Sequence, residues 1–248
     1  MTTSKHYWNS PITEAVIDIR VEVSPDFNTD SLESIHAQIS KDFSKREEIM
    51  FFQGQFNPTA DPTTSATQTK QGYLYRSNNG KYILQTRTNG FTFSHLPPYE
   101  TWNTFRSEAR KLWDTYREVA KPVRVTRVAV RSINRIDLPP PVDLKEYFNT
   151  FPEVAPGMPQ MLSGYVMQLL IAQEDFGGML SLIQATAIAP RPDVASIVLD
   201  IDLYKESSSE FDSDEKIWQL LELIRDRKNE VFESCVTDKA RDIFKPSE

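Results

Sequence analysis

The chain has 248 residues, of which 39% are hydrophobic, and a formal net charge of −7. A chain of this length can bury a core without disulfides or metals, and its single cysteine, Cys235, excludes an internal disulfide and paired-cysteine zinc or redox sites. The acidic balance opposes sequence-independent binding to DNA or anionic membranes over most of the surface.

The first half predicts a strand, a helix, a meander of strands and a long helix. Apolar residues alternate from Ile12 to Val23, which indicates a half-buried strand, and an apolar stripe at helical spacing follows from Leu32 to Phe43. Short strands joined by Asn-Gly turns predict an antiparallel meander over residues 49–94, with a polar loop at 57–68. The spacing of aromatic and aliphatic residues then predicts an amphipathic helix over 102–116.

The second half repeats this order. We expect a strand over 123–138, a short helix near 144–148, three strands over 164–173, 179–188 and 196–204, an amphipathic helix over 217–232, and a tail helix that ends near Phe244. The order predicts a degenerate internal repeat with halves 11–120 and 121–244, although antiparallel α+β chains can alternate in this way by chance. The expected fold is a single α+β domain over 1–248: pseudo-duplicated strand-helix-meander-helix units form one broad antiparallel sheet with helices on one face.

Charged residues recur every fourth position on the first strand of each half, so each set shares one face of its strand. The acidic row is Glu14, Asp18 and Glu22, and the basic row is Arg127, Arg131 and Arg135. If these strands pair antiparallel about a local dyad, the expected partners are Asp18 with Arg131, Glu14 with Arg135 and Glu22 with Arg127. Cross-strand ion pairs of this kind contribute about 0.2–1 kcal/mol each, so they would favour specific pairing more than stability.

The same six residues are also the candidate ligand-binding set. Arginine binds phosphate or carboxylate through two parallel hydrogen bonds, so these rows could line a groove for an anionic partner. Solvated charge on an ordinary outer sheet face is the third interpretation.

Catalytic and metal signals are sparse. The three histidines are scattered, and Cys235 lies in an apolar helical context typical of a buried residue. The carboxylates Asp200 and Asp202 share a strand face and, with Asp18 or Glu22, could hold Mg²⁺. We nevertheless predict no catalytic residue, no metal site and no cofactor.

Several segments resemble a sporadically distributed prokaryotic family that carries an N-terminal P-I-x-E-A motif. The segments are Pro11-Ile12-Thr13-Glu14-Ala15, Pro98-Tyr99-Glu100-Thr101-Trp102-Asn103-Thr104-Phe105, Arg131-Ser132-Ile133-Asn134-Arg135-Ile136, and Asn229-Glu230-Val231-Phe232 with Thr237-Asp238. The resemblance spans almost the whole chain and transfers no site residue. The family's sporadic distribution implies horizontal transfer, which suggests by analogy a role in mobile or defence-associated gene modules.

The expected function is a non-catalytic binding or regulatory protein that recognises a protein, peptide or anionic ligand on its sheet face. The alternative is a Mg²⁺-dependent phosphohydrolase, or a nucleotide- or polyphosphate-binding enzyme, in which Asp18, Glu22, Asp200 and Asp202 hold the metal in a tunnel-like sheet. A nucleic-acid saddle would suit a repeat, but the net charge opposes it. No membrane partner is expected, since the chain lacks a signal peptide and a long apolar run, and a cytoplasmic location is predicted.

Overall fold

The computed structural model describes residues 7–57, 63–207 and 209–246. Nine antiparallel strands form one sheet in the order β2-β3-β4-β5-β1-β6-β9-β8-β7. The strands are β1 (Ile12–Glu22), β2 (Lys45–Asn57), β3 (Thr63–Arg76), β4 (Tyr82–Arg87), β5 (Gly90–His95), β6 (Arg124–Leu138), β7 (Val166–Gln173), β8 (Gly178–Ala187) and β9 (Ala195–Glu206). The helices are η1 (Thr29–Glu33), α1 (Ser34–Ile39), α2 (Trp102–Ala120), α3 (Leu144–Tyr147), α4 (Asp214–Cys235) and α5 (Asp238–Phe244).

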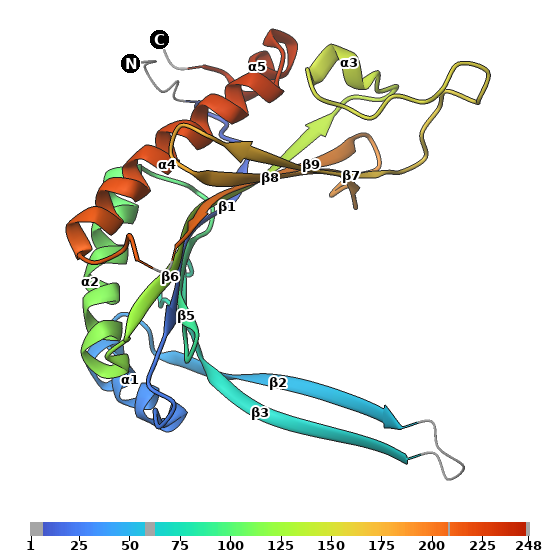
Figure 1. Ribbon diagram of the computed structural model, residues 1–248. Helices are drawn as coiled ribbons and strands as arrows, with labels where there is room; N and C mark the ends of the chain where they lie inside the picture. Colours follow the sequence, from blue (N-terminus) through green and yellow to red (C-terminus); the bar gives the residue numbers. More distant parts are fainter. Residues whose placement is uncertain (1–6, 58–62, 208, 247–248) are drawn as a thin grey trace.

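The sheet is strongly curved (Figure 1). Helices α1, α2 and α4 lie along its convex face, while the β2–β3 hairpin and the β7–β8 end reach out on the concave side. No described helix covers the concave face in this view. The expected α+β class with one large antiparallel sheet is therefore confirmed.

The central strands β1 and β6 separate an apolar face, which the helices cover, from a face that carries charged residues. Alternate residues of β1 such as Ile17 and Ile19 are fully buried against the helices. The residues between them, including Asp18, point to the concave face, because successive side chains of a strand alternate in direction. On the helix side, Phe105 and Trp113 of α2 complete the core. The apolar residues that recur at strand and helix spacing in the sequence therefore form the contacts between the sheet and its helices.

Two local predictions were wrong. The segment 63–68, expected within a polar loop, belongs to β3, because its backbone pairs with the long β2 strand up to Asn57↔Thr63. Residues 58–62 lie outside the described part of the chain. The helix expected along the stripe from Leu32 to Phe43 is shorter, since it consists of η1 followed by the six residues of α1, after which the chain turns into β2. Among the described residues, none of the helices combines the length and the apolar character that a membrane span requires.

Candidate functional site

The two charged rows do lie on neighbouring strands, because β1 pairs antiparallel with β6. The register differs from the prediction: Val16 is opposite Arg131, and Asp18 is opposite Ala129. Register shifts occur between Ile12 and Glu14 and between Arg20 and Val21, and a bulge of this kind moves every later pair by one position.

The expected partners are corrected accordingly. Asp18 pairs with Arg127 at 2.9 Å, and Arg131 instead bridges to Asp200 of β9. Glu22 pairs with Arg124, not with Arg127. Arg135 pairs with Asp137 of its own strand rather than with Glu14. The predicted opposition of carboxylates and guanidinium groups is present, but with other partners.

These residues form a larger network on the concave face, which we call the charge ladder. It consists of Asp18, Arg20, Arg87, Arg127, Arg131, Asp200 and Asp202. Arg127 donates to Asp18 at 2.9 Å and to Asp202 at 2.8 Å, and its guanidinium stacks over the ring of Tyr204. Each carboxylate of the ladder is therefore engaged by at least one arginine.

The buried carboxylate of Asp18 is the centre of the ladder. Burial alone would raise its pKa, but the hydrogen bond from Thr92 at 2.5 Å and the charges of Arg20 and Arg127 outweigh burial and lower the pKa. Burial dominates at Asp202, whose pKa is raised despite Arg127. The ladder has four arginines and three carboxylates, and every arginine in it already contacts a carboxylate, which weakens the field that an incoming anion would meet. Its geometry also gives little to a metal: no group of three or more potential ligand side chains is found among the described residues.

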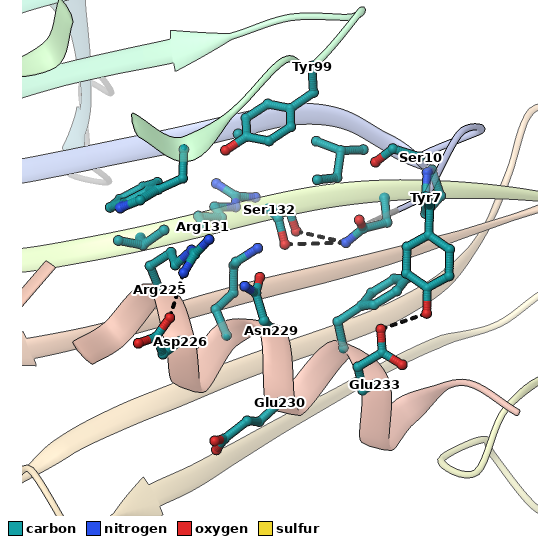
Figure 2. Close-up of a pocket in the computed structure, with 18 of the residues that line it drawn as sticks. Tyr7, Ser10, Tyr99, Arg131, Ser132, Arg225, Asp226, Asn229, Glu230 and Glu233 are labelled. Carbon is teal, nitrogen blue, oxygen red and sulfur yellow. Dashed lines mark hydrogen bonds and ion pairs between the residues drawn. The ribbon is translucent and has the colours of Figure 1, made fainter. Parts of the chain in front are cut away.

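A different site lies on the helix-covered side of the sheet. A cavity of about 900 Å³ opens between α4, the residues leading into α2, and the β1–β6 pair (Figure 2). The four chain segments that carry the family resemblance all contribute to its lining, through residues such as Ile12, Tyr99, Asn134 and Asn229. Segments more than 200 residues apart in sequence are thus brought together around one hollow.

The cavity has an aromatic wall and a polar wall. Tyr99, Trp102 and Phe105 provide flat apolar surface next to the start of α2. The other wall comes from α4, whose Arg225 and Asn229 are seen beside the space in Figure 2. Lys228 of the same helix turn also lines the cavity. An apolar wall with a few convergent polar groups is typical of small-molecule sites.

Lys228 is the most unusual group of this lining. Its ammonium has no ion pair or hydrogen bond with any residue in the described ranges 7–57, 63–207 and 209–246. Burial and the nearby positive charge of Arg225 lower the pKa of Lys228 to about 8. The neighbouring Arg225 is already paired with Asp226 at 2.7 Å and lies over the ring of Trp102. Lys228 is therefore a cation at neutral pH whose charge is not compensated by a direct partner.

Two further polar groups next to the cavity lack partners within the described chain. Burial raises the pKa of the Tyr99 hydroxyl to about 12, and this hydroxyl makes no hydrogen bond to a described residue. His95 packs behind Tyr99 and Phe105, with ring centroids 5.1 and 5.7 Å away, and is fully buried. Neither of its ring nitrogens has a hydrogen-bond partner in the described part of the chain. An unsatisfied buried polar group costs about 1–3 kcal/mol, so such groups call for an explanation.

Sequence reasoning missed Lys228, because polar residues of an amphipathic helix are normally assigned to its solvent side. A usable signal was present: Arg225, Lys228 and Phe232 follow at helical spacing, so a polar stretch interrupts the apolar stripe of α4. Arg131, a predicted ligand-binding residue, also borders the cavity, but its guanidinium pairs with Asp200 and belongs to the ladder on the other face, as do Asp18 and Arg127.

Comparison of the chain with protein-family models and with curated proteins gives no match. The resemblance drawn from the sequence motifs stays a prediction.

Proposed function

We propose that the protein is a binding or regulatory protein that holds an anion with a flat apolar body in the cavity beneath α4. The observation that carries the proposal is the uncompensated ammonium of Lys228 on the polar wall, opposite the aromatic wall of Tyr99 and Trp102. A ligand carboxylate or phosphate would supply the missing counter-charge, and the aromatic side chains would cover the ligand's apolar part.

We assign the anion to the cavity and not to the sheet face, because the cation in the cavity has no direct counter-charge whereas those on the sheet face do. The arginines of the charge ladder already contact carboxylates, so a ligand anion there would have to compete with Asp18, Asp200 and Asp202. The same pairing weakens the metal-dependent phosphohydrolase alternative, because Mg²⁺ would have to displace arginine from each of its ligands.

We further propose that the chain is a doubled unit. The strand order supports this: reading outward from the centre, the first half gives β1-β5-β4-β3-β2 and the second half gives β6-β9-β8-β7. Helices α2 and α4 occupy corresponding places at the end of each half. The cavity would then lie near the local dyad, where the two halves meet.

A thermal-shift experiment with three probes tests the binding proposal. Adenosine monophosphate combines a flat ring with an anion, adenosine lacks the anion, and inorganic phosphate lacks the ring. A ligand at about 100 times its Kd adds roughly 2.7 kcal/mol to the free energy of unfolding. We expect adenosine monophosphate to raise the Tm of the full chain more than either fragment does.

The matched variants are Lys228→Met, which removes the proposed anchor, and Lys216→Met, which removes an exposed lysine of the same helix that pairs with Asp212. The shift should vanish in Lys228→Met and persist in Lys216→Met. Equal shifts in both variants, or no shift with any probe in the unmodified chain, would contradict the proposal.

A further inference from the structure

The two outermost strands of the sheet differ sharply in charge. The edge strand β2 begins with Lys45, Arg46, Glu47 and Glu48, and such charges discourage edge-to-edge pairing. The opposite edge, β7, has the sequence VMQLLIAQ and contains no charged residue. Its side chains are largely exposed: Val166 is 78% exposed and Leu170 is 65% exposed. Native proteins seldom leave an uncharged apolar edge strand open to solvent.

The direction of the backbone groups of β7 follows from its pairing with β8. The carbonyl of Tyr165 accepts a hydrogen bond from the N–H of Thr186, so the backbone groups of Tyr165 face β8. Backbone groups of successive residues alternate between the two sides of an antiparallel strand. Those of Val166, Gln168, Leu170 and Ala172 therefore point outward, where no strand in the described part of the chain pairs with them.

We propose that β7 pairs antiparallel with β7 of a second copy about a two-fold axis at Leu170, which joins two sheets into one continuous sheet. In this register Leu170 lies opposite its own counterpart, and Gln168 lies opposite Ala172. These are residues whose backbone groups point outward, so about six hydrogen bonds can form across the axis. Leu169 and Ile171 then lie opposite each other on the other face.

The uncharged β7 is an edge at which two copies of this acidic chain can meet without bringing like charges together. Two copies of a chain with net charge −7 repel each other over most of their surface. At β7 no charged residue of one copy meets a like charge of the other, and the residues on both sides of Leu170, Leu169 and Ile171, are apolar and would lie opposite each other. The closed two-fold arrangement also leaves no second β7 edge open for further growth.

Disulfide trapping tests this arrangement directly. The Cα atoms of a directly opposed, hydrogen-bonded pair lie about 5.5 Å apart, which a disulfide can bridge. The native Cys235 is buried and does not compete. Under mild oxidation Leu170→Cys should give a covalent dimer in most of the protein, whereas Val123→Cys, at an exposed apolar position just before β6, should not.

Light scattering gives the second readout. The unmodified chain should show a mass that rises with concentration from monomer toward dimer, Leu170→Lys should remain monomeric at every concentration, and Val123→Lys should behave like the unmodified chain. If the unmodified chain is monomeric at about 100 μM, the proposal is overturned, even if β7 instead pairs with a peptide of another protein. Equal cross-linking of Leu170→Cys and Val123→Cys, or a dimer that survives Leu170→Lys, would overturn it as well.

Discussion

The charge ladder and the cavity lie on opposite faces of the same central strands, yet they handle charge in opposite ways. On the concave face, arginines surround Asp18, Asp200 and Asp202, so opposite charges offset each other. On the helix side, Lys228 has no direct partner in the described chain, and its pKa is lowered to about 8. A compensated network can be explained by folding alone. An uncompensated cation in a cavity destabilises the fold, which points to a role in binding.

The largest expected effect comes from breaking the compensated network. Asp18→Asn removes the carboxylate that Arg20, Arg87 and Arg127 share and leaves their charges partly buried. Breaking a buried pair on one side costs about 3–5 kcal/mol, and we expect about 3 kcal/mol less free energy of unfolding at pH 7. Denaturant unfolding measures this, and a loss below about 1 kcal/mol would show that the ladder is not a coupled network.

In the cavity we expect a substitution to stabilise the protein. Lys228→Met removes an uncompensated cation, and we expect the free energy of unfolding at pH 7 to rise by about 2 kcal/mol. Because the folded-state pKa lies below that of an unfolded lysine, the unfolded chain binds more protons between about pH 8 and 10.5. The unmodified chain should therefore gain stability as pH rises through this window, and Lys228→Met should lose that slope. A destabilised Lys228→Met would mean that the ammonium has a compensating partner.

Binding should follow the protonation of Lys228. Affinity for adenosine monophosphate should be constant from pH 7 to about 8 and then fall by up to tenfold per pH unit, because the anchor loses its proton. The phosphate stays dianionic throughout this range, since its second pKa is near 6. The other charged or titratable groups in the lining are Arg225, Asp226, Glu230 and Glu233 of α4, Arg241 of α5, Arg131 of β6, and Glu100, Tyr7 and Tyr99. Calorimetric titration measures the profile, and an affinity unchanged up to pH 10 would assign the anchor to an arginine instead.

The smallest effect should come from the exposed end of the β1–β6 pair. Glu22→Gln removes a partner of Arg124, and both side chains are about half exposed. Exposed ion pairs contribute about 0–1 kcal/mol, so we expect a change below 0.5 kcal/mol in denaturant unfolding. If Glu22→Gln lowered the free energy of unfolding as much as Asp18→Asn, the difference in burial between the two ion pairs would not determine their contribution to stability.

The sequence predicted the antiparallel sheet and the contact between its two charged strands, because period-two alternation such as that from Ala15 to Val23 reports directly on strand faces. It did not predict the register. The shift near Arg20 is a single irregularity in strand pairing, and a bulge of this kind produces no repeating sequence pattern from which it could be predicted. The cavity was also beyond sequence reasoning, because Tyr99, Asn134 and Lys228 meet only once three distant segments have packed.

The most direct measurement of the central claim is the pKa of Lys228, followed by NMR of isotope-labelled, dimethylated lysines with Lys228→Met as the assignment control. The account predicts one lysine that titrates near pH 8 in the unliganded protein and moves to a higher pKa when adenosine monophosphate is added. A Lys228 that titrates near 10.5, and does not respond to the ligand, would contradict it.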